Sequence, residues 1–142
     1  MPWSPLASGA LSGKYTRATP TAGDTRRGAH VAPHVGDALF DLVDVLGEIA
    51  GNVGGTVAGV ALAWVRQQDA VTSTLIGART VEQLDANLGS IDIELDDEQL
   101  ARLSAMTTPE LDYPMTVMES IALPFQYGPT TINGLTSTAF QR

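Results

Sequence analysis

Apolar side chains recur at helical intervals in the middle of the chain. Within residues 37–50, five of them follow the i, i+3, i+4, i+7 spacing that places side chains on one face of a helix. These residues are Leu39, Leu42, Val43, Leu46 and Ile49. Glycines in residues 51–55 interrupt the pattern, and Thr56 has a side chain suited to capping a following helix. We therefore predict one amphipathic helix over residues 37–50 and a second that begins after Thr56.

The predicted second helix, residues 57–68, carries a single apolar stripe. Its members are Val57, Val60, Ala61, Trp64 and Val65. Gly59 lowers the helix propensity of this segment, and we interpret it as a position that allows close packing. The β-branched run at residues 71–76 is bounded by Ala70 and Gly77, which predicts a short buried strand.

Two capping patterns predict further helices. Thr80 with Gln83 fits the capping box, and Asp96 is followed by Gln99 at the equivalent position. We expect Val81, Leu84 and Leu88 to face inward on the first of these helices, and Leu100 and Leu103 on the second. An extended link, residues 91–95, joins them.

The remaining segments carry little periodicity. Pro2 and Pro5 restrict the N-terminal segment, which resembles the end of a strand passing into a loop. Residues 16–36 are rich in Thr, Ala, Gly and Pro and predict a long loop. We assign no regular structure after Met106, so residues 107–142 are expected to form an irregular tail.

The order of strand end, loop, helices, strand and helices is typical of an α/β fold with parallel strands. The 142 residues are 44% hydrophobic and 17% charged, a globular composition that suits one domain or part of one. A buried parallel strand needs neighbours on both sides, and only one complete strand is predicted here. The chain is therefore expected to be a piece of a larger α/β domain.

Charge and residue usage exclude several functions. Six acidic and six basic side chains precede Val81, whereas ten acidic and two basic ones follow, and the net charge is −8. This acidic second part argues against nucleic-acid binding. The chain has no cysteine, which excludes disulfides and thiolate metal sites. No signal peptide or long apolar run is visible, so we expect a cytoplasmic protein without membrane segments.

The stretch LIGARTVEQLDANL, residues 75–88, is the strongest candidate for a binding site. A strand that ends at Gly77 and turns into a capped helix leaves free backbone N–H groups beside the positive end of the helix dipole. Arg79 adds a planar guanidinium suited to phosphate, and Gln83 and Asn87 are four residues apart on the helix. The alternative is an ordinary strand-to-helix turn with an exposed arginine.

Other candidate chemistry is weaker. SGALSGKY lacks both the spacing and the Ser/Thr of a phosphate-binding P-loop, because Tyr15 follows Lys14. His30 and His34 are separated by Pro33 and have no attached carboxylate motif, so we expect no metal site. Trp3 is either a core aromatic or a stacking platform. No serine-hydrolase motif is present.

Three stretches together resemble the C-terminal part of an aldo-keto reductase. PWSPLASGALSGKY is similar to the seventh barrel strand and its loop, VALAWVRQQDAVTSTLIGARTVEQLDANL to the last helix–strand–helix section, and IDIELDDEQLARLSAM to the final helix. The resemblance implies the C-terminal part of a (β/α)8 barrel, incomplete in this chain, that binds NADP(H) and reduces small carbonyl substrates. Residues 1–142 would then be one partial NADP-dependent oxidoreductase domain.

The same resemblance assigns cofactor contacts residue by residue. It implies that Trp3 stacks on the nicotinamide and that Lys14 reaches a phosphate. Gly77, Arg79 and Gln83 would surround the 2′-phosphate, and Asn87 would contact the adenine. The pyrophosphate path would be lined by Ser4, Pro5, Leu6 and Ala7. Ala86 stands where the family often has glutamate, so one adenine contact is expected to be missing.

The family's catalytic Asp, Tyr, Lys and His motifs do not occur in this sequence, and Tyr15, Tyr113 and Tyr127 lie in the wrong contexts. We therefore expect no catalytic residue and no activity from this chain alone. Alternatives are a nucleotide-binding module without chemistry and a truncated or degenerate fragment. Unpaired barrel strands would favour self-association, and an in-frame sequence upstream of Met1 carrying the missing residues would indicate a truncation.

Overall fold

The computed structural model describes residues 1–20, 28–122, 130–132 and 135–136. The chain divides into two units, Met1–Thr107 and Thr108–Arg142. In the first unit the helical segments are η1 (Ala7–Ser12), α1 (Gly28–Val31), η2 (Ala32–His34), α2 (Asp37–Val53), α3 (Val57–Arg66), α4 (Val81–Leu88), η3 (Gly89–Asp92) and α5 (Asp97–Thr107). The unit is therefore built mainly from helices.

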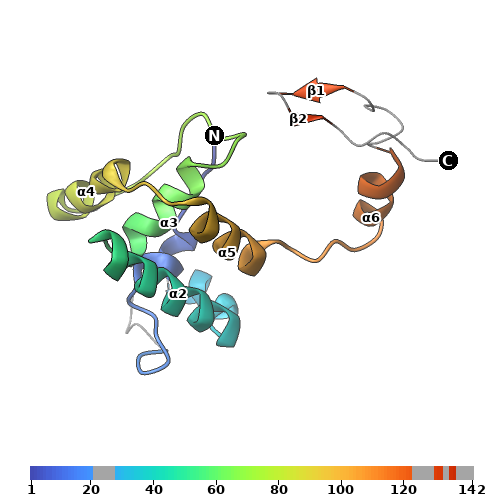
Figure 1. Ribbon diagram of the computed structural model, residues 1–142. Coiled ribbons are helices and arrows are strands. Elements are labelled where there is room, and N and C mark those ends of the chain that lie inside the picture. The colour runs from blue at the N-terminus through green and yellow to red at the C-terminus, as the bar shows by residue number, and fades with distance from the viewer. Residues whose placement is uncertain (21–27, 123–129, 133–134, 137–142) are drawn as a thin grey trace. The chain divides into compact units, whose positions relative to one another are not determined.

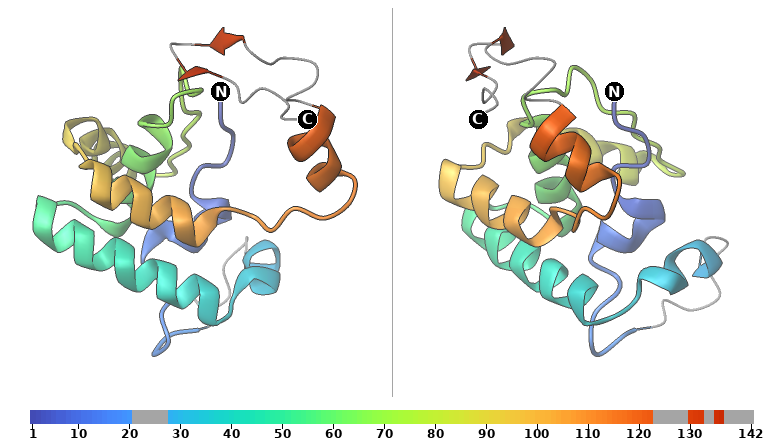
Figure 2. Two further views of the ribbon diagram at one scale, coloured as in Figure 1. Left: turned by 45° about the vertical axis from the view of Figure 1, so that its right-hand side comes forward. Right: turned by 90° about the vertical axis from the view of Figure 1, so that its right-hand side faces the viewer.

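Helices α2, α3 and α5 enclose the hydrophobic core. The views in Figures 1 and 2 show α5 running alongside α2, and α3 also packs against α2. The largest fully buried side chains include Leu46 and Ile49 from α2, Val60 from α3 and Leu103 from α5. These residues belong to the predicted apolar faces, so the predicted helices over 37–50 and after Thr56 are confirmed.

The predicted caps are also confirmed. The Thr56 hydroxyl accepts a hydrogen bond from the Gly59 N–H at 3.0 Å. At the start of α5, the Gln99 N–H donates to the Asp96 carboxylate at 2.8 Å, and the Asp96 N–H donates to the Gln99 side chain at 3.1 Å. Each cap supplies an acceptor to a backbone donor that has no partner inside its helix.

Gly59 is buried where α3 meets the segment that follows η3. A Cβ added to Gly59 would lie 3.0 Å from the Ile93 Cδ1 and 3.1 Å from the Thr56 Oγ1. Both separations are shorter than ordinary van der Waals contact. The close packing expected at this glycine is therefore present, and it allows Ile93 to reach the core.

The predicted buried strand over residues 71–76 is wrong. The pairing of this segment that the structure describes is an isolated parallel bridge between Leu75 and Trp3. Leu75 and Ile76 are 48% and 38% exposed. A strand needs neighbours to pair its backbone and cover its faces, and this segment gains one pairing partner at a single point. The β-branched composition therefore favours a strand, but the described surroundings neither pair nor bury this segment as a buried strand requires.

The predicted inward face of α4 is also wrong. Val81, Leu84 and Leu88 are 68%, 41% and 44% exposed. Their spacing makes one apolar stripe, but the part of the first unit that the structure describes does not cover it. The helix itself forms as predicted, and its Thr80 cap accepts from the Gln83 N–H at 3.2 Å.

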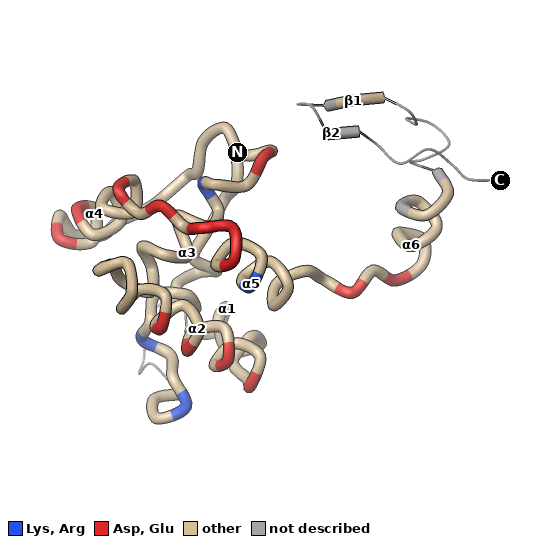
Figure 3. The backbone as a smooth tube through the Cα atoms, in the orientation of Figure 1, with Lys and Arg blue, Asp and Glu red and all other residues tan. Residues whose placement is uncertain are grey.

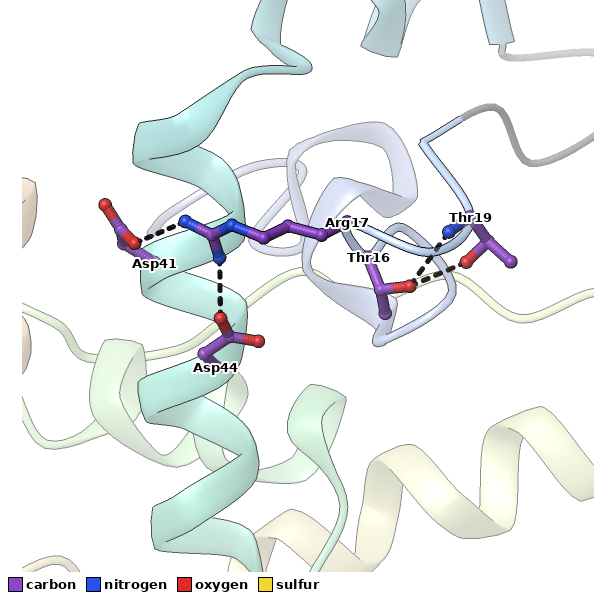
Figure 4. A network of polar contacts seen from close by, with 5 residues as sticks. All are labelled: Thr16, Arg17, Thr19, Asp41 and Asp44. Carbon is purple, nitrogen blue, oxygen red and sulfur yellow. Dashed lines mark hydrogen bonds and ion pairs between the residues drawn. The ribbon is translucent and has the colours of Figure 1, made fainter.

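The expected loop over residues 16–36 contains short helices where it is described. Residues 28–34 form α1 and η2, and Val31 packs in a second buried cluster with Tyr15 and Leu39. Residues 21–27 lie outside the described part. Arg17 joins the preceding segment to α2, because its guanidinium contacts Asp41 and Asp44 at 2.7 Å each (Figure 4).

Polar contacts of Gln67 and Arg102 help to attach α5 and its preceding segment to the other helices. The Gln67 side chain donates to the Leu95 carbonyl and accepts from the Leu95 N–H, both at 3.1 Å. Arg102 on α5 donates to both carboxylate oxygens of Glu48 on α2, at 3.0 and 2.8 Å. Figure 3 shows acidic residues spaced along α2, so Arg102 meets a largely negative helix surface.

The Arg102–Glu48 pair predicts a pH-dependent contribution to stability. The hydrogen bond from Arg102, and then its charge, hold the pKa of Glu48 below its ordinary value of 4.5. A carboxylate with a lowered folded-state pKa stabilises the fold above its unfolded pKa, and this contribution is lost as pH falls through the folded value. Glu48→Gln should lower the Tm at pH 7, only slightly because the pair is exposed, and the difference should be smaller at pH 3, below the ordinary pKa of the carboxyl group.

Thermal unfolding followed by circular dichroism at both pH values would measure this. Glu110→Gln is the matched control, because it removes an exposed carboxylate from the second unit. An equal Tm difference at pH 7 and pH 3 would contradict the assignment.

The second unit contains α6 (Met115–Val117), η4 (Met118–Ala122) and the strands β1 (Thr131–Ile132) and β2 (Leu135–Thr136). The two strands pair antiparallel, with Thr131 opposite Thr136. The sequence led us to assign none of these elements. Among the described residues, no single helix is long and apolar enough to cross a membrane; α2 and α3 meet that test only as a pair bent by 91°.

Candidate functional site

The N-terminal segment and the segment before α4 meet in one backbone contact. The Leu75 N–H donates to the Pro2 carbonyl at 3.0 Å, and Trp3 and Leu75 form a parallel bridge. More than seventy residues separate these positions in the sequence. The contact brings Trp3 beside the stretch that leads to Gly77 and Arg79, so two stretches with candidate site residues are neighbours in space.

Trp3 is available for stacking. Its side chain is 83% exposed, which excludes the core interpretation for this residue. An aromatic ring needs one open face to stack on a flat ligand. Trp3 therefore has the exposure that a stacking platform requires.

The segment after Trp3 turns tightly into η1. Ser4, Ala7 and Ser8 have positive φ angles of 54°, 47° and 58°, a conformation that residues with a Cβ seldom adopt. The Ser4 carbonyl accepts from the Ala7 N–H at 2.9 Å, and the Leu6 carbonyl accepts from the Gly9 N–H at 2.8 Å. Left-handed residues of this kind concentrate at functional sites. The segment thus has an unusual backbone where Ser4, Pro5, Leu6 and Ala7 were expected to line a ligand.

Lys14 lies beside the end of η1. Its ammonium nitrogen is 5.1 Å from the centroid of the Tyr15 ring. The same nitrogen would be 3.3 Å from a Cβ built on Gly9. The side chain is exposed. Gly9, at φ 101°, therefore gives the turn its conformation and leaves room for the lysine.

The start of α4 exposes Gly77, Arg79 and Gln83. No heavy atom lies within 4 Å of a Cβ built on Gly77, so the backbone there is open to approach. The Gln83 side chain accepts from the Arg79 N–H at 3.1 Å, which fixes the backbone on which the guanidinium is carried. The three residues occupy one exposed turn, with a permanent positive charge in it.

Glu82 is a residue of this turn that the sequence analysis overlooked. Its own backbone N–H and the Thr80 side chain hydrogen-bond to the carboxylate and lower its pKa. The carboxylate therefore already uses part of the donor capacity at the helix N-terminus. The position of Glu82 could have indicated this role, since an acidic residue in the first turn of a helix commonly accepts from the free backbone N–H groups there.

Asn87 differs from the other candidate residues because it is buried, with 9% of its surface exposed. It lines a cavity of about 260 Å³ that also borders α3 and residues 71–74. Its carbonyl accepts from the Ser90 hydroxyl at 2.6 Å. Gln83 and Asn87 thus share a helix but not the same surroundings.

The two described tyrosines belong to different units of the chain. Tyr15 is 3% exposed and lies in the cluster with Val31 and Leu39, while Tyr113 belongs to the second unit. Tyr127 lies outside the described residues. His30 and His34 are exposed on separate short helices, and the described part of the chain contains no group of three side chains suited to hold a metal.

Comparison with known proteins gives a consistent family match. The model of the aldo/keto reductase family matches residues 1–107, about three quarters of the chain. Protein tas of Escherichia coli is 35% identical over 105 residues, which is 73% of this chain and 30% of that protein.

Two further relatives have reductase or oxidoreductase in their names. The protein named uncharacterized oxidoreductase YrpG of Bacillus subtilis is 33% identical over 102 residues, 72% of this chain and 30% of its own length. Norsolorinic acid reductase stcV of Emericella nidulans is 34% identical over 59 residues, 42% of this chain and 15% of its own. The chain therefore spans less than a third of the length of these curated relatives.

Proposed function

The chain belongs to the aldo/keto reductase family, and we propose that it forms the NADP(H)-binding portion of an oxidoreductase. The family implies a (β/α)8 barrel with a nicotinamide cofactor. In this proposal Trp3 lies against the nicotinamide and Ser4, Pro5, Leu6 and Ala7 follow the pyrophosphate with Lys14. Gly77, Arg79 and Gln83 hold the 2′-phosphate, and Asn87 contacts the adenine. Bound NADPH would supply the hydride that reduces a carbonyl.

The contact between Pro2 and Leu75 carries this proposal. It joins the backbone beside Trp3 to the strand-like segment that precedes Gly77. An aromatic ring can stack on the nicotinamide end of an extended NADP(H), and a guanidinium can bind the 2′-phosphate at its other end. Exposed Trp3 and exposed Arg79 supply these groups from two neighbouring segments.

The residues present fit the cofactor in most respects. Lys14 and Arg79 are cations in exposed positions, and the backbone at Gly77 is open. Glu82 opposes a phosphate at the start of α4, so Arg79 must provide the attraction that the helix terminus alone does not. A guanidinium suits this task because it stays charged and offers paired donors.

We further propose that residues 1–142 alone reduce no carbonyl. A proton donor must stand within hydrogen-bond reach of the carbonyl oxygen, and Tyr15 is buried among apolar side chains. Several exposed apolar residues favour an incomplete barrel. Its missing strands and helices would come from an extension of this chain or from another copy of it. The apolar residues concerned are Trp3, Leu75, Ile76, Val81, Leu84 and Leu88.

The test is a titration of the purified chain with NADPH, followed by an assay with an aromatic aldehyde. The proposal predicts saturable binding and no turnover. Turnover by this chain would refute the claim of inactivity, while absence of saturable binding would refute the claim of a cofactor site. Loss of cooperative unfolding would instead favour a fragment that does not fold alone.

Glu82→Gln should strengthen NADPH binding about two- to fivefold, because it frees the first-turn donors of α4 from a competing carboxylate. The variant keeps the size of the side chain and removes its charge. Fluorescence titrations of the parent and variant at equal ionic strength would measure the ratio. Asp85→Asn on the same helix is the control, and an equal gain in that variant would reduce the effect to net charge.

A further inference from the structure

Lys14 and Arg79 differ from the other lysine and arginine side chains that the structure describes. Arg17, Arg66 and Arg102 each have a carboxylate oxygen within 4.0 Å. Within the described ranges, Lys14 and Arg79 form no ion pair. Their charges are therefore not neutralised by a neighbouring carboxylate there, which suits both side chains to bind an anion.

The Lys14 ammonium is confined by its surroundings, although the side chain as a whole is exposed. It lies 5.1 Å from the centroid of the Tyr15 ring, within the range of a cation–π interaction. It also lies against η1, since a Cβ built on Gly9 would be 3.3 Å from the ammonium nitrogen. The Lys14 carbonyl accepts from the Thr19 hydroxyl at 3.1 Å. These contacts restrict a side chain that is ordinarily flexible.

The Tyr15 ring is itself fixed by packing. It is 3% exposed and lies in a buried cluster whose other members come from η1, α1 and α2, namely Ala10, Val31, Leu39 and Val43. A ring fixed in this way can hold an ammonium group in one place without contacting a ligand. A cation held in place before binding loses less conformational entropy when it meets a phosphate.

We propose that Tyr15 is a positioning residue of the cofactor site, whose ring holds the Lys14 ammonium over the η1 turn so that it meets the pyrophosphate of the dinucleotide. This inference rests on the proposed NADP(H) site and adds to it a buried residue that acts only through Lys14. A cation–π interaction of an exposed ammonium corresponds to a factor of about two to five in affinity.

The test replaces Tyr15 with phenylalanine and with phenylalanines that carry one, two or three fluorine atoms. Each fluorine weakens the attraction between the ring face and a cation and changes the shape of the ring little. NADPH affinity should fall stepwise along the series, to about two- to fivefold below that of Tyr15→Phe. Saturable NADPH binding with a flat series would overturn this inference and leave the cofactor site standing, whereas no saturable binding in the parent chain would refute both.

Two controls separate positioning from packing. The same fluorinated series at Phe40, whose buried ring lies 5.7 Å from the Arg17 guanidinium carbon, should leave NADPH affinity unchanged. In a Lys14→Met background the Tyr15 series should become flat, because the ring then has no cation to hold. An equal decline with and without Lys14 would show that Tyr15 acts through packing and would contradict the inference.

The position of the ammonium can also be measured without cofactor. Lys14 is the one lysine in the sequence, so labelling with ¹³C-lysine gives the NMR signals of a single side chain. In the free parent chain, the Tyr15 ring should shift the ε-methylene protons of Lys14 upfield from those of a lysine in solution. Unshifted ε-methylene protons would overturn the inference independently of NADPH binding.

Discussion

Replacing Leu46 with alanine should lower the free energy of unfolding of the first unit by about 2–5 kcal/mol. Leu46 is 2% exposed and packs in the core with Val60 and Leu103. It also borders a small apolar cavity of about 60 Å³, which the substitution would enlarge. The expected loss is a large share of the 5–15 kcal/mol typical of a folded domain. Urea unfolding followed by circular dichroism would measure it.

Leu84→Ala is the matched control, because it removes the same atoms from the exposed face of α4. Leu84 is 41% exposed, and its replacement should change the free energy of unfolding by no more than about 0.5 kcal/mol. Equal losses in the two variants would contradict this account, since they would require α4 to be covered in the folded chain. The pair therefore tests where the core ends.

Arg79→Ala should weaken NADPH binding by about ten- to a hundredfold and leave NADH binding nearly unchanged. The proposed partner of the guanidinium is the 2′-phosphate, which NADH lacks. A charge-assisted hydrogen bond contributes about 1.5–3 kcal/mol, which accounts for the expected range. Parallel titrations with NADPH and NADH would measure both affinities.

Arg17→Ala serves as the control for net charge. Arg17 is also an exposed arginine, and it contacts Asp41 and Asp44 on α2 rather than the start of α4. Its replacement should leave the NADPH affinity within about twofold, because exposed charges are well screened at physiological salt. An equal loss of affinity in Arg17→Ala and Arg79→Ala would mean that NADPH responds only to overall charge.

The helices could be predicted because their determinants are local. The spacing of Leu39, Val43 and Leu46 decides which side of α2 is buried, and Thr56 and Asp96 cap their own helices. The strand over residues 71–76 could not be predicted in the same way. Its formation depends on neighbouring strands, and Trp3 supplies only one bridging position.

The prediction that one face of α4 points inward was wrong for a related reason. Val81, Leu84 and Leu88 have the spacing of a buried stripe, but burial requires a second surface to pack against. The described part of the first unit leaves all three exposed. Sequence periodicity thus identifies which residues share a face, and the tertiary surroundings decide whether that face is covered.

The candidate site was predictable in its residue types more than in its surroundings. Composition and the capping pattern lead to Gly77, Arg79 and Gln83, and the structure places them on one exposed turn. The burial of Asn87 depends on how α3 and α4 pack against each other, which brings together residues distant in sequence. No local pattern contains that information.

Quenching of Trp3 fluorescence by NADPH tests most directly whether the two segments form one cofactor site. The signal of Trp3 is the difference between the parent chain and Trp3→Phe, a variant expected to fold normally because Trp3 is 83% exposed. This account predicts saturable quenching of that difference signal, with a midpoint raised at least tenfold by Arg79→Ala. Saturable NADPH binding that leaves the Trp3 signal unchanged would contradict it.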